Sequence, residues 1–426
     1  MIKAVRGTRD LLPPDTDLWN FVEARVREVF ARYNFHEIRT PLFEATELFA
    51  RGVGEETDIV SKEMCTWEDR ARAASEKPQS LTLRPEATSG IVRAYIEHDL
   101  NRTGLLQKLY MIGPMFRRER PQKGRYRQFF QIDAEIIGPP SSGSELPVRD
   151  AEVIEMLTAI LEAVGLTGWS LELNSVGCAK CRPLYNQALR EALAGVKDKM
   201  CVDCRRRAET NPLRVLDCKV PEDQPIIEAL PKISQYLDDD CRANFAEVRA
   251  MLDSMAIAYH INERMVRGLD YYTRTTFEFT HGELGAQSAV LGGGRYDGLS
   301  ELLGGPRAPA TGFAIGEDRL VLALQAQAKA VITLPAAYII PLGAGMNRHA
   351  LRLARELRRK GLIVDLGDES FRVKKSFEMA GKLGAKYAVL VGENEVASDS
   401  FAVKNLGSGE QVAIPRAELA ARLQAM

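Results

Sequence analysis

The sequence predicts an α/β protein. A large α+β body with an antiparallel or mixed sheet carries a helical insertion and precedes a small α/β domain. Strand-like segments occur before residue 320 without regular strand–helix alternation, at 81–84, 109–116, 129–137, 170–174, 271–280 and 287–291. Between about 178 and 260 the sequence becomes charged and helix-like, with clustered cysteines. Beyond residue 335 strands and helices alternate, which indicates a mainly parallel sheet flanked by helices.

The first predicted element is an amphipathic helix after the turn at Pro13–Asp17. Its apolar side chains recur at helical spacing, at Leu18, Val22, Val26, Val29, Phe30 and Tyr33. A strand over Glu37–Pro41 follows and is expected to end at its proline. Standing alone, this helix would be interpreted as an ordinary surface helix.

Two antiparallel strands are expected on either side of a basic loop that begins at Arg117. In the second strand, alternation puts Gln131, Asp133 and Glu135 on one face, while Phe130, Ile132, Ala134 and Ile136 lie on the other. Polar side chains approached by several guanidinium groups suit a ligand that carries both phosphates and cationic groups. A solvated hairpin with a charged outer face is the alternative.

The last ninety or so residues predict a separate α/β unit. Its expected elements are a strand at 337–342, a helix at 347–360, a strand at 362–366, a helix at 372–383 and a strand at 386–391. The first of these helices carries a basic face formed by Arg352, Arg355, Arg358, Arg359 and Lys360. This face can follow RNA phosphates or be an ordinary solvated helix face, and the sequence leaves both open.

Composition limits the class of protein. The 57 basic and 58 acidic residues predict no global attraction to nucleic acid, so any RNA contact must use local basic patches. No apolar run reaches the roughly 18–20 residues of a membrane helix, and no signal-peptide pattern is found, so a cytoplasmic protein is expected. A Walker A pattern is absent, and Gly343-Ala344-Gly345 lacks the third glycine of a dinucleotide fingerprint.

The seven cysteines suggest thiols or a metal site rather than disulfides. Cys178-x2-Cys181 and Cys201-x2-Cys204 have the spacing of a zinc ribbon, and Cys218 follows as a spare thiol. The four paired cysteines are therefore predicted to converge on one structural zinc ion, with free buried thiols as the alternative.

Five segments resemble, in order along the chain, the motifs of the class II aminoacyl-tRNA synthetases, and in particular those of the bacterial histidyl-tRNA synthetase family. Residues 15–41, 109–137 and 312–322 are similar to the general motifs 1, 2 and 3. Arg-Gly-Leu-Asp-Tyr-Tyr at 267–272 and Leu-Gly-Gly-Gly-Arg-Tyr-Asp-Gly-Leu at 291–299 resemble the two motifs private to the histidine enzymes. The resemblance implies a catalytic core at 1–325 with its insertion at 178–260, a linker at 326–334, an anticodon-binding domain at 335–426, and a homodimer built through motif 1.

The resemblance implies that ATP with Mg²⁺ and L-histidine form histidyl-adenylate, from which histidine passes to its tRNA. In the family's pattern Arg117 bridges the amino-acid carboxylate and the α-phosphate, and Arg125 and Arg319 hold the γ-phosphate end. Arg267 supplies a cation to the adenylation transition state, so Arg117 and Arg267 are the candidate catalytic residues. For Arg319, an ion pair with Asp318 or Glu317 is the structural alternative.

The same resemblance implies the histidine-binding set. Glu86, Thr88 and Gln131 match positions that hold the α-ammonium group, with Ala87 where the family more often has glycine. Glu135 and Tyr272 match the imidazole partners, and Tyr271 lies beside them, although one of the two tyrosines is expected only to fill the core. Arg267 also belongs to this set. Gln122 and Arg127 match positions that read the tRNA acceptor end.

Two other functions share parts of this pattern. The regulatory subunit of ATP phosphoribosyltransferase resembles the catalytic domain, but it usually lacks an intact private motif, part of the arginine set and the C-terminal domain. Synthetases for glycine, proline or threonine lack the run at 267–272. All these features are present here, which favours the histidine enzyme.

Overall fold

The computed structural model describes residues 2–55, 57–69, 78–266, 268–284, 288–329, 331 and 333–425. They divide into two compact units, Met1–Ala330 and Val331–Met426. Within the described part of the chain, no helix is long and apolar enough to cross a membrane.

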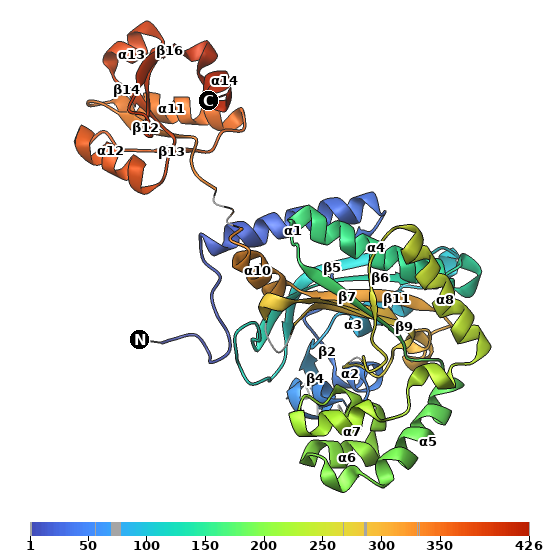
Figure 1. The fold of residues 1–426 in the computed structure, drawn as a ribbon. Helices are drawn as coiled ribbons and strands as arrows, with labels where there is room; N and C mark the ends of the chain where they lie inside the picture. The colour runs from blue at the N-terminus through green and yellow to red at the C-terminus, as the bar shows by residue number, and fades with distance from the viewer. Residues whose placement is uncertain are drawn as a thin grey trace. The chain divides into compact units, whose positions relative to one another are not determined.

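Unit 1 is organised around an eight-stranded sheet with the order β1-β5-β6-β11-β10-β9-β7-β8 (Figure 1). Its strands are β1 (His36–Glu37), β5 (Gln107–Phe116), β6 (Gln128–Ile137), β7 (Trp169–Ser175), β8 (His260–Ile261), β9 (Thr273–His281), β10 (Ala289–Arg295) and β11 (Ala310–Gly316). Only the two edge pairs, β1 with β5 and β7 with β8, are parallel, and the others are antiparallel. The predicted mixed sheet is confirmed.

Helices cover both faces of this sheet (Figure 1). One face is covered by α1 (Asp15–Arg32), α4 (Pro147–Val164) and α8 (Asp239–Ser254), and the other by α3 (Thr88–Glu97). The predicted first helix is confirmed as α1, which buries Leu18, Trp19, Val22, Val26, Val29 and Phe30. Two short helices, α2 (Thr46–Val53) and α9 (Leu299–Leu302), and α10 (Glu317–Ala326) after β11 complete the body.

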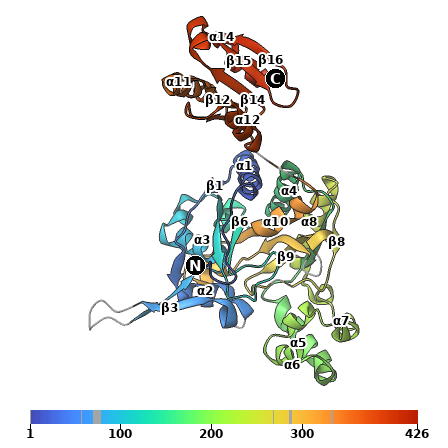
Figure 2. The same ribbon diagram turned by 90° about the vertical axis from the view of Figure 1, so that its left-hand side faces the viewer.

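The strand predicted over Glu37–Pro41 is shorter than expected. Only β1 forms, and one more hydrogen bond, from the Ile38 N–H to the Tyr110 oxygen at 2.8 Å, extends the pairing with β5. Pro41 has no N–H to donate, and the Thr40 carbonyl accepts from Arg84 at 3.1 Å, so the chain leaves the sheet. It then enters a three-stranded sheet of β2 (Phe43–Ala45), β4 (Gln79–Leu83) and β3 (Cys65–Asp69), in which β3 extends away from the body (Figure 2).

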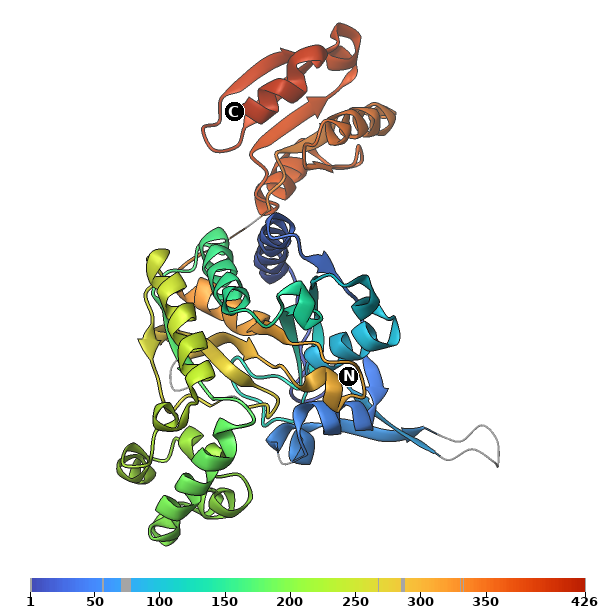
Figure 3. The same ribbon diagram turned by 90° about the vertical axis from the view of Figure 1, so that its right-hand side faces the viewer.

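The insertion leaves the sheet after β7 and returns through α8. It contains α5 (Cys181–Ala194), α6 (Val202–Thr210), α7 (Gln224–Glu228) and short 3₁₀ turns. These three helices gather at the side of unit 1 that lies away from α1 (Figure 3). They enclose a small apolar core around Tyr185, Leu189 and Val215, in which several cysteines take part.

Unit 2 contains a five-stranded sheet with the order β13-β12-β14-β15-β16. Its elements are β12 (Ala337–Pro341), α11 (Met346–Arg359), β13 (Val364–Leu366), α12 (Val373–Lys382), β14 (Tyr387–Val391), α13 (Glu393–Ser398), β15 (Ser400–Asn405), β16 (Gln411–Pro415) and α14 (Arg416–Ala425). The first three strands are parallel, but β15 and β16 form an antiparallel hairpin, so the sheet is mixed rather than mainly parallel. This hairpin was not expected, because its outer strand leaves most of its side chains exposed and so lacks a strong apolar pattern.

Candidate active site

A cavity of about 230 Å³ lies on the α3 side of the large sheet. Of the residues singled out in the sequence, it is lined by Glu86, Thr88, Arg117, Arg125, Gln131, Glu135, Tyr271, Tyr272 and Arg319. Ala87, Gln122 and Arg127 are not part of the lining. Ala87 is buried instead in an apolar cluster with Ile91 and Met115. Arg267 lies outside the described residues.

The polar face of β6 forms the floor of this cavity. Gln131, Asp133 and Glu135 all line it, whereas Ile132, Ala134 and Ile136 are fully buried on the opposite face. The Gln131 Oε1 and Asp133 Oδ2 atoms are buried and have no hydrogen-bond partner in the part of the chain that the structure describes. Because an unpaired buried acceptor is costly, these two atoms suit a ligand that brings N–H donors.

Glu135 is held from two sides. Its Oε1 accepts from the Thr88 hydroxyl at 2.7 Å, and its Oε2 accepts from the Tyr296 hydroxyl. Burial raises the pKa of Glu135 to about 8, although the hydrogen bonds from Tyr296 and Thr88 act against this rise. Room for the carboxylate exists only because β11 has a glycine opposite: a Cβ on Gly312 would lie 1.6 Å from Glu135 Oε2.

Glu86 and Asp133 make the cavity rich in carboxyl groups. The Glu86 oxygens accept the backbone N–H groups of Thr88 at 2.8 Å and Ser89 at 3.0 Å, which are the first donors of α3. Burial raises the pKa of Glu86. Burial, together with the charges of Glu135 and Glu86, raises the pKa of Asp133 well above its usual value. Three crowded carboxyl groups favour a cationic ligand.

Arginines surround the other part of the cavity. Arg117 Nε donates to the Pro85 oxygen at 2.9 Å, and its guanidinium lies 5.1 Å from the centre of the Phe129 ring. Arg125 pairs with Glu119 at 2.9 Å. Arg319 Nη1 donates to the Ala289 oxygen at 2.5 Å.

These guanidinium groups also influence one another. Burial lowers the pKa of Arg319, and the charge of Arg125 lowers it further. Like charges gathered in a partly buried site favour a polyanion such as a polyphosphate. Asp318 was the alternative ion-pair partner for Arg319. It instead accepts hydrogen bonds from Arg9 at 2.6 Å and from the Phe130 N–H at 2.8 Å.

Tyr271 and Tyr272 both line the cavity, with ring centroids 4.8 Å apart. The Tyr271 ring also meets the edge of Tyr296 at 5.4 Å. Both also belong to a buried apolar cluster with Tyr95 and Tyr296, so the expectation that one of them only fills the core stays a prediction.

The private motif at 291–299 contributes in two different ways. Gly292 lines the cavity, but a Cβ on Gly293 would lie 2.1 Å from the Gly312 oxygen, so this second glycine is needed for β10 to pair closely with β11. Arg295 is fully buried and pairs with Asp150 at 2.9 Å and Asp297 at 3.1 Å. It is a structural residue outside the cavity lining.

The N-terminal segment supports the loop between β5 and β6, and sequence reasoning did not identify it. Besides its ion pair with Asp318, Arg9 lies over the ring of Tyr126 with its guanidinium carbon 4.2 Å from the ring centroid. The Arg127 N–H donates to the Gly7 oxygen at 2.7 Å. Gln122 and Arg125 exchange backbone hydrogen bonds across this loop. No periodic pattern marks Arg9 in the sequence.

The predicted four-cysteine metal site is wrong in its ligand set. Cys178 and Cys181 lie with Asp238 and Cys241, whereas Cys201 and Cys204 lie with Cys218 and Asp223. The two cysteines of each Cys-x2-Cys pair do lie in the same group, but the further members of each group are determined by how the helices of the insertion pack. Cys218, expected to be a spare thiol, belongs to the second group.

Comparison with known proteins identifies the family. The family model of histidyl-tRNA synthetase matches residues 7–320, and the family model of an anticodon binding domain matches residues 336–426. A histidine–tRNA ligase of Koribacter versatilis is 75% identical over 420 residues, which cover 99% of this chain and 95% of the relative. That of Solibacter usitatus is 57% identical over 427 residues, covering 100% and 99%. The apo histidyl-tRNA synthetase of S. aureus superposes with a TM-score of 0.79 at 35% identity, covering 100% of both chains. The chain therefore belongs to the histidyl-tRNA synthetase family of class II aminoacyl-tRNA synthetases.

Proposed function

We propose that this ligase attaches L-histidine to its cognate tRNA in two steps, through a histidyl-adenylate formed from ATP with Mg²⁺. The observation that carries the proposal is the division of a single cavity into a carboxyl-rich part and an arginine-rich part. Histidine brings an ammonium group and an imidazole, and ATP brings a polyphosphate. One cavity with both kinds of surface holds the two reactants side by side.

The carboxyl-rich part is the proposed histidine site. Among the described residues, Gln131 Oε1 and Asp133 Oδ2 have no hydrogen-bond partner, and they would accept from the α-ammonium group, next to Glu86 and Thr88. Glu135 and Tyr272 would contact the imidazole, with Tyr271 beside it. Because these polar groups would remain unpaired beside an amino acid without ring nitrogens, such amino acids are rejected strongly.

The arginine-rich part is the proposed site of ATP. Arg117 would contact both the histidine carboxylate and the α-phosphate, while Arg125 and Arg319 would hold the γ-phosphate end. Glu119, beside Arg125, offers a carboxylate for Mg²⁺. The family resemblance assigns Arg267 to the transition state as a further cation.

The two steps need positioning and charge neutralisation more than a strong base. A carboxylate oxygen of histidine attacks the α-phosphorus, and the bond to the β-phosphate oxygen breaks to release pyrophosphate. The terminal ribose hydroxyl of the tRNA then attacks the activated carbonyl carbon, loses its proton, and displaces AMP.

We assign the loop between β5 and β6, with Gln122 and Arg127, to the acceptor end of the tRNA, and unit 2 to its anticodon arm. On α11, Arg352, Arg355 and Arg359 are exposed and available to phosphates. Arg358 and Lys360 are exposed as well, although Arg358 donates to the Val364 oxygen at 2.8 Å and Lys360 lies 3.9 Å from Glu356. All five basic residues therefore belong to the face proposed for RNA.

A homodimer is part of the proposal. Leu42, Phe43 and Trp67, next to the end of motif 1, are large apolar side chains with exposed fractions of 45%, 52% and 40%. Phe43 and Trp67 lie on β2 and β3, the two outer strands of the three-stranded sheet, with ring centroids 5.8 Å apart. Exposed apolar groups of this kind are typical of a protein–protein interface. Sedimentation analysis of the purified chain measures the oligomeric state, and a monomer at micromolar concentration would contradict this part.

ATP–pyrophosphate exchange with a panel of amino acids tests the chemistry. Exchange is expected with histidine alone, and exchange with another amino acid, or with none, contradicts the proposal. Removal of residues 335–426 should leave exchange measurable while sharply raising the tRNA concentration needed for charging. Residual tRNA binding should depend less steeply on salt, because fewer phosphate contacts remain. Unchanged charging at low tRNA concentration by a folded truncation would refute the role of unit 2.

A further inference from the structure

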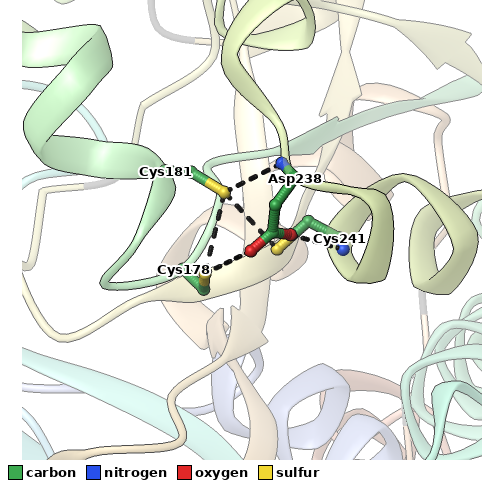
Figure 4. A group of neighbouring side chains, drawn as sticks. All are labelled: Cys178, Cys181, Asp238 and Cys241. Atoms are coloured by element: carbon green, nitrogen blue, oxygen red, sulfur yellow. Dashed lines mark hydrogen bonds between the residues drawn. The ribbon is translucent and has the colours of Figure 1, made fainter.

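The insertion holds two groups of three cysteines and one aspartate. The first comprises Cys178, Cys181, Asp238 and Cys241 (Figure 4), and the second comprises Cys201, Cys204, Cys218 and Asp223. Within each group, the potential ligand atoms all lie within 4.8 Å of one another. We propose that each group binds one structural zinc ion through three thiolates and one carboxylate.

The first group has the dimensions of a tetrahedral zinc site. Two sulfurs bound to one ion at about 2.3 Å lie about 3.8 Å apart, and a sulfur and a carboxylate oxygen about 3.5 Å apart. Cys181 Sγ lies 3.6 Å from Cys178 Sγ and 3.8 Å from Cys241 Sγ, and Cys178 Sγ lies 3.4 Å from Asp238 Oδ2. The sulfurs are much too far apart for disulfides, which need about 2.05 Å.

The second group repeats these dimensions with a different chain order. Cys201 Sγ lies 3.9 Å from Cys218 Sγ, and Cys218 Sγ lies 3.2 Å from Asp223 Oδ2. The Cys201 N–H donates to Asp223 Oδ1 at 3.1 Å, which fixes the orientation of the carboxylate. Cys204 completes the group and is fully buried.

Backbone N–H groups point at four of the six sulfurs. Their sulfur acceptors are Cys178 (from Lys180, 3.4 Å), Cys181 (from Asp238, 3.2 Å), Cys201 (from Cys204, 3.4 Å) and Cys218 (from Val220, 3.4 Å). A neutral thiol is a weak acceptor, whereas a metal-bound thiolate carries negative charge that such donors stabilise. The pattern therefore suits metal-bound sulfurs better than a cluster of free thiols.

The positions of the two groups explain what the ions would do. The first joins the segment that leaves β7, at Cys178 and Cys181, to the start of α8, at Asp238 and Cys241, and so closes the base of the insertion. The second fastens the start of α6 to the turn at 218–223. Short helices around a small apolar core gain much of their stability from such a metal site.

The first site also lies next to the loop that carries the private tyrosines. Arg182, which follows Cys181, donates to the Asp270 oxygen at 3.2 Å and to the Tyr272 oxygen. Loss of this ion should therefore shift the 268–272 loop and raise the KM for histidine more than that for ATP. This consequence rests on the proposed function, whereas the metal content does not.

Elemental analysis of the full chain, purified under reducing conditions without chelator, tests the proposal. Two zinc ions per chain are expected. Cys241→Ser and Cys218→Ser should each retain one ion, and the matched control Cys65→Ser, from neither group, should retain two. Less than half an ion per wild-type chain, or two ions in both site variants, would overturn the proposal.

A second pair of variants distinguishes the loss of a metal ligand from misfolding of the insertion. Asp238→Asn and Asp223→Asn preserve every thiol and nearly the same side-chain shape. Each variant should lower the affinity for zinc at its own site, the first and the second respectively, while all the sulfur ligands remain. Cobalt(II) added to the zinc-depleted full chain should reach saturation at two equivalents, with the absorption of tetrahedral sulfur-bound cobalt. Saturation at one equivalent, or no such absorption, would refute the second site or both. Failure of histidine-dependent exchange with two ions still bound would count against the proposed function alone.

Discussion

Two groups of buried charges lie close together in unit 1 and are satisfied in different ways. Burial acts to lower the pKa of Arg295, but the charges of Asp150 and Asp297 outweigh it and raise the pKa, so this charge is matched inside the protein. In the cavity, burial raises the pKa of Asp133, and the neighbouring charges of Glu135 and Glu86 raise it further. A buried charge that is matched internally is costly to separate from its partner, whereas crowded carboxyl groups with raised pKa values are typical of a site for a cationic ligand.

The largest expected effect is on stability and concerns Arg295, whose charge is matched inside the protein. Arg295→Ala should lower the free energy of unfolding by about 3–5 kcal/mol, because it leaves the carboxylate of Asp150 buried without its cation. Urea denaturation measures the loss. The control Arg307→Ala removes an exposed pair with Glu145 and should cost at most about 1 kcal/mol. Equal losses in the two variants would remove the basis of the comparison.

A substitution in the arginine-rich part of the cavity should affect catalysis rather than stability. Arg117→Ala is expected to slow histidine-dependent pyrophosphate exchange on the order of a hundredfold, because one fixed cation is lost near the reacting phosphate. The neighbouring Arg118 is exposed and does not line the cavity, so Arg118→Ala should retain most of the exchange rate. Similar rates in the two variants would show that Arg117 only supports the loop.

Glu135→Gln should separate the two substrates. Loss of a charge-assisted hydrogen bond to the imidazole should weaken histidine binding by about 1.5–3 kcal/mol, while ATP binding changes little. The two KM values in pyrophosphate exchange provide the measurement, with Glu145→Gln as an exposed control. A parallel rise in both values would argue against the assignment of Glu135.

The smallest expected effect is a pH dependence of the ligand-free protein. Folded Glu135 holds its proton up to about pH 8, whereas its usual pKa is 4.5, so the folded state binds more protons between these values. Stability from this group is complete below pH 4.5 and is lost as the pH rises toward 8. Between pH 6 and pH 7, the free energy of unfolding of the wild type should fall by about 1.4 kcal/mol more than that of Glu135→Gln. Identical losses would show that Glu135 is already ionised.

Local patterns predicted the elements of this protein better than its contacts. From Gln131 to Ile136, alternation along β6 correctly separated the residues of the cavity floor from those of the core, because strand geometry alone determines that division, but Phe130, expected on the core face, is only partly buried and lines the cavity. The partners of Cys178 and Cys201 depend on the packing of helices far apart in the chain, and spacing contains no such information. Likewise, the sequence does not show that Arg295 is matched internally while Arg117 faces a cavity.

The close approach of Glu135 to Gly312 restricts how this family can change its sequence. Alanine at 312 would place an atom where the carboxylate of Glu135 already lies, so a glutamate at 135 requires a glycine at 312. The obstruction does not end with the side chain of Glu135, because the same Cβ would lie 2.5 Å from the Ala134 oxygen, a backbone atom that no substitution on β6 removes. A shorter side chain at 135 would therefore still leave position 312 closed to any residue with a Cβ. The glycine is required by the close approach of the two strands as well as by the carboxylate, so it can be lost only if β6 and β11 move apart.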